Sequence, residues 1–188
     1  MAHIIVFAIT SYIFLSPALA HAVEPESGLS LGYKAYQNGS FEKAVEYLES
    51  AKKDDFIISD YTSYYLGEAY LSLNRFDEAL NAFDACIKYH IKSPLAPLAL
   101  EKIGDVYLTK GNIINSINTY KAFLAEYPDN SQTPYVLYKL ISILISNNML
   151  DEAIPFIRRL LVEFPQQEYS DFSNLKMLYH EIKKLDAD

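Results

Sequence analysis

The sequence predicts an all-α protein, a right-handed superhelical solenoid of about four helical hairpins followed by a C-terminal capping helix. Three observations support this fold class. A pattern of small and large apolar residues recurs in four segments, 35 to 37 residues apart. Within each segment the apolar residues follow the spacing of an amphipathic helix. Half of the chain (51%) is apolar, but one hairpin cannot bury both of its faces, so the units must stack on one another.

The composition narrows the class of protein. The 188 residues leave room for one domain or one short repeat array. Acidic residues outnumber basic residues, 24 to 16, and the formal net charge is −8. Because a protein that binds nucleic acid needs a basic surface, we expect no nucleic-acid partner. The single cysteine excludes an intramolecular disulfide and a cysteine-rich metal site.

Residues 1–22 have the features of a secretory signal peptide. No Asp, Glu, Lys or Arg precedes Glu24, and residues 4–9 are all apolar. Pro17 interrupts the apolar stretch, and two Ala-x-Ala sites follow, at residues 18–20 and 20–22. An apolar segment, a helix breaker and small residues at the cleavage site are typical of exported proteins. We therefore expect the chain to be exported.

An uncleaved membrane anchor is the alternative interpretation of this segment. About 20 apolar residues span a bilayer, and residues 4–23 just reach that length. A lipid anchor is not expected, because no cysteine stands near the cleavage region. In both interpretations the charged part of the chain, from Glu24 onward, lies outside the cytoplasm.

The repeated units follow this leader, in an array over residues 23–165. Three columns of equivalent positions run through the units. The first column consists of Ala44, Ala79, Ser116 and Ala153. The second consists of Gly32, Gly67, Gly104 and Ile141. The third consists of Phe41, Phe76, Ile113 and Leu150. The units are expected at about residues 26–59, 60–93, 94–130 and 131–165.

Each unit is predicted to form two helices joined by a short turn. In the second unit, Leu66 and Tyr70 form the apolar stripe of the first helix. Ala79, Phe83 and Cys86 form the stripe of the second helix. Residues that tolerate left-handed backbone stand between the two helices of every unit. These turns are Asn38-Gly39-Ser40, Leu73-Asn74, Lys110-Gly111-Asn112 and Asn147-Asn148.

The fourth unit departs from the pattern at two positions. Ile141 stands where the other units have Gly, so we expect the helices of this unit to lie further apart. Pro155 falls inside the second helix, where proline removes a hydrogen bond at a cost of about 3 kcal/mol. We expect a kink there, or a later start of the helix.

The last segment, residues 166–188, is predicted to form a helix that caps the solenoid. Its apolar stripe consists of Leu175, Leu178, Ile182 and Leu185. Solenoids need an end cap with a polar outer face, and the charged residues between these positions supply that face.

The spacing of the columns resembles the tetratricopeptide repeat family. The first unit carries Gly32, Ala35, Gly39, Phe41, Ala44 and Ala51. The second unit carries Leu66, Gly67, Tyr70, Phe76, Ala79 and Phe83. Tyr127-Pro128 and Phe164-Pro165 are similar to the proline that closes a repeat. The resemblance covers about residues 26–165, and it implies a solenoid that binds proteins or peptides.

Within this family, the linkers between units and the segment EYPDN (residues 126–130) look like those of bacterial envelope proteins. One such group is the tetratricopeptide region of the Tol–Pal-associated cell-division coordinator. The other is the lipoprotein subunit of the outer-membrane barrel-assembly machine. The resemblance implies a periplasmic protein. An anchor made by the uncleaved leader and secretion are the alternatives for its location.

The resemblance also implies where a partner binds, because the first helices of a tetratricopeptide array line its concave groove. The residues that face this groove by their helical positions are Tyr33, Tyr36, Tyr61, Tyr64, Glu68, Glu101, Asp105, Tyr135 and Tyr138. Tyrosine offers rigid contact area with a hydrogen-bonding tip and is enriched at interfaces. We expect these residues to hold an extended or helical segment of a protein or peptide, and the acids favour a basic or amphipathic one.

Packing between helices is the alternative role for the groove tyrosines. This role is expected for Tyr65, Tyr70, Tyr107 and Tyr120. Some tetratricopeptide domains hold the C-terminal carboxylate of a chaperone with a Lys/Asn/Arg clamp. The equivalent places here are occupied by Leu29, Tyr33 and Tyr64, so this mode of binding is not expected.

No catalytic, cofactor or metal site is predicted. The chain has no Walker loop, no Gly-x-Ser-x-Gly and no His-Glu-x-x-His. His90 and His180 have no second His or Cys at ligand spacing. Cys86 lies in an apolar stripe, where cysteine behaves as a small apolar residue. The chain is therefore predicted to be no enzyme.

The sequence thus predicts a non-catalytic interaction scaffold of the bacterial cell envelope. The alternative is a structural subunit, in which the array acts as a rigid spacer and uses its convex face or its ends. A glycan is a further candidate ligand, because surfaces rich in tyrosine can stack on sugars.

Overall fold

The computed structural model describes residues 27–54, 59–89 and 92–165, together with positions 177 and 180. Within these residues the chain forms eight α-helices and no strand. The helices are α1 (Gly28–Gln37), α2 (Phe41–Asp54), α3 (Ser59–Ser72), α4 (Phe76–Tyr89), α5 (Ala96–Thr109), α6 (Ile113–Glu126), α7 (Thr133–Ser146) and α8 (Leu150–Glu163). The predicted all-α repeat fold is confirmed. The predicted signal peptide lies outside the described residues, as does the predicted capping helix apart from positions 177 and 180.

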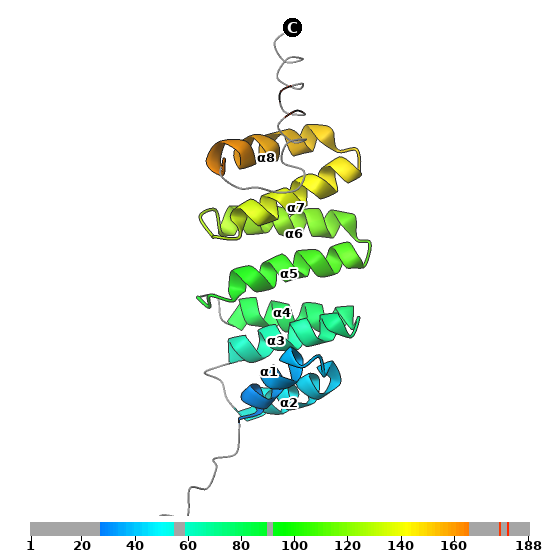
Figure 1. Cartoon of the computed structure of the whole chain (residues 1–188), viewed down its shortest axis with the longest axis vertical. Coiled ribbons are helices and arrows are strands. Elements are labelled where there is room, and N and C mark those ends of the chain that lie inside the picture. Colours follow the sequence, from blue (N-terminus) through cyan, green and yellow to red (C-terminus); the bar gives the residue numbers. More distant parts are fainter. Residues whose placement is uncertain (1–26, 55–58, 90–91, 166–176, 178–179, 181–188) are drawn as a thin grey trace, which may run out of the picture.

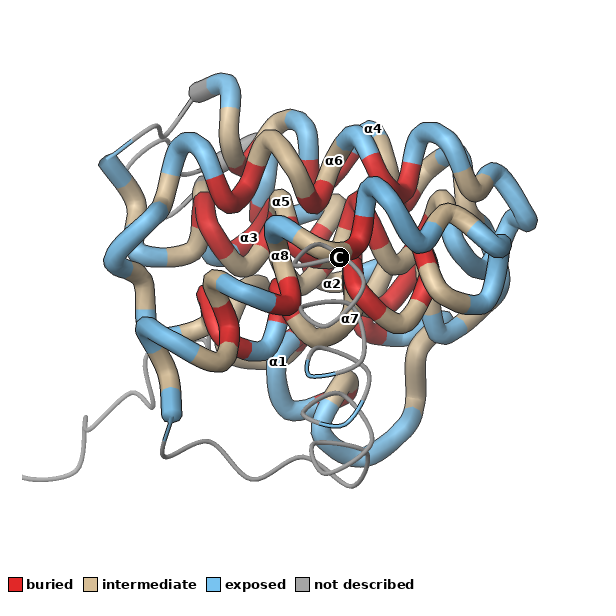
Figure 2. Tube along the Cα trace, turned by 90° about the horizontal axis from the view of Figure 1, so that it is seen from above, coloured by how far each residue is buried: buried red, intermediate tan, exposed pale blue. Residues whose placement is uncertain are grey.

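The helices stack in chain order into a solenoid (Figure 1). Each helix packs against the next helix in the sequence, and α1 also contacts α3 in the following hairpin. Seen along the stack, buried residues lie where helices face one another, and exposed residues lie on the outer sides (Figure 2). Four hairpins result, and each combines a first helix (α1, α3, α5 or α7) with a second helix (α2, α4, α6 or α8).

The turn inside each hairpin has the same backbone conformation. In each hairpin, one residue of the turn between the two helices has a positive φ angle. These residues are Gly39 (71°), Asn74 (57°), Gly111 (73°) and Asn148 (58°). The N–H of the next residue donates to the carbonyl five positions earlier, as Asn112 does to Tyr107 at 2.8 Å. This bond satisfies a carbonyl that the helix end leaves without a partner. The predicted left-handed turns are therefore confirmed.

The glycine column brings the two helices of a hairpin close together. A Cβ atom added to Gly67 would lie 2.5 Å from the ring of Phe83, and one added to Gly104 would lie 2.5 Å from the ring of Tyr120. Both rings are fully buried. The small residue of the first helix thus makes room for a large residue of the second helix.

In the fourth hairpin, different residues fill the space between the two helices. Ile141 replaces the glycine, and Ile157 occupies the position of Phe83 and Tyr120. Both isoleucines are fully buried in one apolar cluster, so the larger residue on α7 is matched by a smaller residue on α8. The expectation of a later helix start at Pro155 is wrong, because α8 runs without a break from Leu150 to Glu163 and includes this proline.

Two apolar clusters form the core. One extends over α1 to α5 and the other covers α6 to α8. Cys86 is fully buried in the first cluster, and burial raises the pKa of its thiol to about 12. A thiol that stays protonated is a poor nucleophile, which agrees with the structural role predicted for Cys86. No helix in the described part of the chain is long and apolar enough to cross a membrane.

Candidate functional site: an aromatic cavity and an ionic ladder on the first helices

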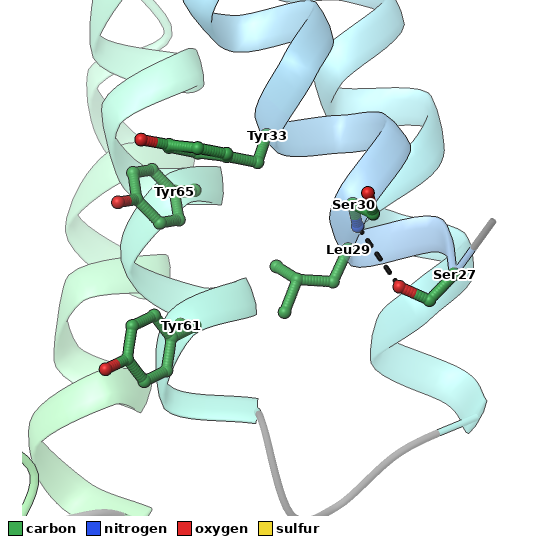
Figure 3. A pocket seen from close by; sticks show the side chains of 6 residues that line it. All are labelled: Ser27, Leu29, Ser30, Tyr33, Tyr61 and Tyr65. Carbon is green, nitrogen blue, oxygen red and sulfur yellow. Dashed lines mark hydrogen bonds between the residues drawn. The ribbon is translucent and has the colours of Figure 1, made fainter.

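A cavity of about 430 Å³ opens between α1 and α3, at the N-terminal end of the surface formed by the first helices. We call the surface of α1, α3, α5 and α7 the first-helix face. The cavity is lined mainly by apolar atoms, from Ser27, Leu29, Ser30, Tyr33, Tyr61 and Tyr65 (Figure 3). Its volume falls in the range of protein ligand pockets, roughly 300–1,000 Å³. It can therefore hold an apolar group of a ligand.

Helical spacing places the lining residues. Leu29 and Tyr33 stand four positions apart on α1, and Tyr61 and Tyr65 stand four positions apart on α3, so each pair shares one helix face. The start of α1 is held by Ser27, whose Oγ accepts the N–H of Ser30 at 3.2 Å. The two pairs face each other across the cavity (Figure 3).

The tyrosine rings form the aromatic wall of the cavity. The ring centroids of Tyr33 and Tyr65 lie 4.8 Å apart with an interplanar angle of 55°. Burial raises the pKa of the Tyr65 hydroxyl, and the neighbouring Tyr33 adds to this effect. Tyr33 remains 37% exposed and Tyr61 42% exposed. The cavity thus offers uncharged aromatic surface that packing within the chain has not covered.

Ionic pairs join the first helices over the rest of this face. Lys102 Nζ on α5 lies 3.0 Å from Glu68 Oε1 on α3. Lys139 Nζ on α7 lies 2.7 Å from Asp105 Oδ1 on α5. In both pairs the lysine follows the acid by 34 residues and belongs to the next repeat. We call this series of pairs the ionic ladder.

The step of the ladder between α5 and α7 is a partly buried network. Lys139 also donates to Glu101 at 2.7 Å, and Glu101 is buried. Asp105 accepts a short hydrogen bond from the hydroxyl of Tyr120 on α6. Burial lowers the pKa of the Lys139 ammonium, but the hydrogen bonds to Asp105 and Glu101 outweigh this and raise the pKa overall. Lys139 is therefore held in its charged form.

The remaining predicted groove residues lie along the same face. Tyr36 donates to Glu68 Oε2 at 3.0 Å, and its pKa is raised to about 12, first by burial and then by the charge of Glu68. Tyr135 is exposed, and the ammonium of Lys139 lies 4.6 Å from its ring centroid. Tyr36 thus joins α1 to α3, whereas Tyr135 contacts a lysine of its own helix, and neither residue lines the cavity.

Two of the predicted groove tyrosines are partly buried between helices. The ring of Tyr64 lies 5.8 Å from the ring of Phe83, and Tyr138 packs against the C-terminal apolar cluster. Among the predicted residues, only Tyr33 and Tyr61 line the cavity. Packing between helices, the alternative role, is thus observed for Tyr64 and Tyr138.

Three residues of this face were not predicted. Tyr65 packs against the N-terminal apolar cluster, as expected, but its ring also lines the cavity. Lys102 and Lys139 are the cations of the ladder. Since Tyr65, Lys102 and Lys139 stand 37 residues apart, they form a column of their own. The signal that could have identified the two lysines is the recurrence of an acid in one repeat and a lysine 34 residues later in the next repeat.

The described residues include no cluster of three or more His, Cys, Asp or Glu that could hold a metal ion. The carboxylates of Glu68, Glu101 and Asp105 are bound by lysines rather than directed at an open site. This arrangement can bind a ligand by contact and hydrogen bonding.

Comparisons with known proteins agree with this architecture. Residues 64–131 match the tetratricopeptide repeat family. No curated protein sequence matches the chain. The crystal structure of MamA is similar to the fold with a TM-score of 0.61 and 22% identity, and it covers 71% of this chain and 74% of that one.

Two further structures share the fold. A tetratricopeptide repeat protein from Parabacteroides merdae has a TM-score of 0.65 and 19% identity, with 76% of this chain and 54% of that chain covered. The second tetratricopeptide domain of human RPAP3, in complex with an HSP70 peptide, has a TM-score of 0.51 and 19% identity, with 61% of this chain and 92% of that chain covered. Residues 64–131 thus match the tetratricopeptide repeat family, and the similar structures show that the chain shares its repeat fold.

Proposed function

We propose that this chain is a non-catalytic scaffold that binds an extended or helical segment of a partner protein on its first-helix face. Tetratricopeptide repeats generally mediate protein–protein interaction, and the RPAP3 domain binds an HSP70 peptide. The observation that carries the proposal is the aromatic cavity between α1 and α3. Exposed rings in such a cavity lose contact with water when a ligand covers them, and apolar burial of this kind drives association.

The charges on this face favour an amphipathic partner over a strongly basic one. Glu68, Glu101 and Asp105 already contact Lys102 and Lys139, so a basic segment would have to compete with cations held in place. An amphipathic segment gains more, because one apolar side chain can enter the cavity while its polar side chains lie along the ladder.

The proposed location is the periplasm of a bacterium. The support comes from the apolar leader with its Ala-x-Ala sites at residues 18–20 and 20–22 and from the resemblance of the linkers to envelope proteins. Determination of the N-terminal residue of the protein from fractionated cells tests this part of the proposal. A mature N-terminus near residue 23 in the periplasmic fraction supports it, and an intact leader in the cytosol refutes it.

The binding site is tested by cross-linking in the native envelope, followed by capture of the chain. The double variant Tyr33→Ala/Tyr61→Ala removes two walls of the cavity, whereas Tyr135→Ala removes an exposed ring from the other end of the same face. Partners that are lost with the double variant and kept with Tyr135→Ala support binding in the cavity. Partners that are kept with all variants refute it, provided that circular dichroism shows intact helices.

A second candidate function is that of a structural spacer. Its support is the exposure of apolar residues on the second helices, where Ile114 is 59% exposed and Val162 is 69% exposed. Such residues can contact another copy or another subunit. Sedimentation velocity tests this function. A concentration-dependent increase in mass that Ile114→Ser or Val162→Ser abolishes favours it, and a monomer at all concentrations refutes self-assembly.

A further inference from the structure

A second cavity lies away from the aromatic one, between α4, α5 and α6. Its volume is about 390 Å³. Asp84 comes from α4, Leu100 and Tyr107 come from α5, and α6 adds Asn115, Asn118 and Thr119. Neighbouring repeats thus contribute to it together, and its polar side chains point to a ligand that forms hydrogen bonds.

Asp84 is the only charged residue in the lining of this cavity. Among the described residues no hydrogen bond or ion pair involves its carboxylate. Asp84 is exposed overall, yet partial desolvation raises the pKa of its carboxyl, and no neighbouring cation offsets this effect. A ligand that brings a positive charge is therefore complementary to this carboxylate.

The other lining residues fit the remaining parts of one side chain. Thr119 Oγ1 donates to the carbonyl of Asn115 at 2.8 Å, so the lone pairs of this hydroxyl are the part left to accept. The amide oxygens of asparagine accept as well. Tyr107 offers an aromatic ring for stacking, and Leu100 offers apolar surface for an aliphatic stem.

We propose that this cavity binds an arginine side chain of a partner protein. The guanidinium group pairs with the Asp84 carboxylate, donates to the neighbouring acceptors and stacks on the Tyr107 ring. Arginine suits the site better than lysine, because its planar group has five donors, is weakly hydrated and stacks on aromatic rings. A phosphate or another anion would be repelled by Asp84. A neutral sugar would leave the carboxylate without a counter-charge, and a single carboxylate is a poor metal site.

The proposal is tested by titration of the 15N-labelled chain with N-acetyl-L-arginine amide. The signals of the Asn115 and Asn118 side-chain amides are followed by NMR, in parallel with the matching lysine and citrulline amides. Citrulline has nearly the same shape as arginine but no charge. Saturable shifts with arginine, weaker shifts with lysine and the weakest with citrulline are expected.

Variants separate the proposed contact from general charge effects. Asp84→Asn is expected to weaken arginine binding about tenfold, the effect of losing one charge-assisted hydrogen bond. Glu46→Gln removes the same charge from an exposed position on α2 and is expected to leave binding unchanged. The proposal is overturned if citrulline amide binds as tightly as arginine amide, or if Asp84→Asn binds arginine amide as tightly as the native chain. It is also overturned if arginine amide causes no saturable shifts. The double variant Tyr33→Ala/Tyr61→Ala is expected to retain arginine binding, since this site is independent of the aromatic cavity.

Discussion

Replacement of Lys139 by Met tests whether the ionic ladder stabilises the stack of repeats. Methionine keeps an unbranched apolar stem but removes the ammonium group. In the native chain this group lies 2.7 Å from carboxylate oxygens of both Glu101 and Asp105. Only 7% of the Glu101 side chain and 17% of the Lys139 side chain is exposed to solvent. The substitution therefore leaves two acids close together and largely out of water, without their cation.

The expected loss of stability follows from this burial. Removal of one partner of a buried ion pair costs about 3–5 kcal/mol. Asp105 is 27% exposed, so water solvates one of the two acids and the lower end of the range applies, about 3 kcal/mol. For a chain of this size each kcal/mol lowers the Tm by roughly 2–4 °C, so Lys139→Met is expected to lower it by roughly 6–12 °C. Urea unfolding followed by far-UV circular dichroism measures the free energy directly.

The pH dependence provides a second readout. The folded-state pKa of Lys139 is raised above its ordinary value of 10.5. The stabilisation by Lys139 is therefore complete below that ordinary value and is lost as the pH rises through the folded-state pKa. The difference in unfolding free energy between the native chain and Lys139→Met should be constant from pH 7 to about 9 and should shrink in more alkaline solution.

Lys102→Met is the matched control for this experiment. The Lys102–Glu68 pair is more open, with the lysine side chain 28% exposed and the acid 12% exposed, so a smaller cost of about 1–2 kcal/mol is expected. A cost below about 1 kcal/mol for Lys139→Met would refute the electrostatic reasoning. The reasoning would also be refuted if Lys102→Met cost as much unfolding free energy as Lys139→Met, or more.

Three further predictions concern the packing and the tyrosines. Gly67→Ala should destabilise the chain by about 1–2 kcal/mol in urea unfolding, because the added Cβ meets the buried ring of Phe83 and the strain exceeds the gain in helix propensity; an increase in stability would contradict this packing. Pro155→Ala should stabilise the chain by about 2 kcal/mol, because alanine has the backbone N–H that can donate to the carbonyl of Asp151 inside α8. An unchanged Tm would contradict this prediction. The raised pKa of Tyr36, about 12 in the folded chain against 10.0 ordinarily, keeps its stabilisation complete below pH 10 and removes it as the pH rises through the folded value. An alkaline titration followed by circular dichroism should therefore show stability falling above pH 10, and a flat profile up to pH 12 would contradict it.

The fold could be predicted because the packing of the repeats leaves a pattern in the sequence. A glycine such as Gly104 on a first helix needs a large partner such as Tyr120 on the second helix, and the pair recurs once per hairpin. The expectation of a later helix start at Pro155 was wrong because it considered only the local backbone. Ala153, Ile157 and Leu160 are fully buried on the other side of α8. Their burial outweighs one lost hydrogen bond and keeps the helix continuous.

The candidate site could be predicted only in part. Helical spacing places Tyr33 and Tyr61 on the first-helix face, where they line the cavity, because this position depends on one helix alone. It does not predict which side chains meet across two repeats, since this depends on the offset between neighbouring hairpins. The place of Tyr65 in the cavity wall and the role of Lys139 as a partner of Glu101 were therefore missed.

The residues at the junctions between repeats favour ligand binding at the N-terminal end of the first-helix face. Tyr33 and Tyr65 occupy the places that Glu68 and Lys102 hold one repeat later. At the later junctions a ligand would have to compete with ionic pairs whose geometry is already satisfied. At the first junction the pair is aromatic, with about 430 Å³ of open volume beside it. One apolar side chain that enters this volume gains roughly 1.5–3 kcal/mol from burial without breaking any step of the ladder. The ladder thus stabilises the stack and leaves the first junction as the place where a partner gains the most.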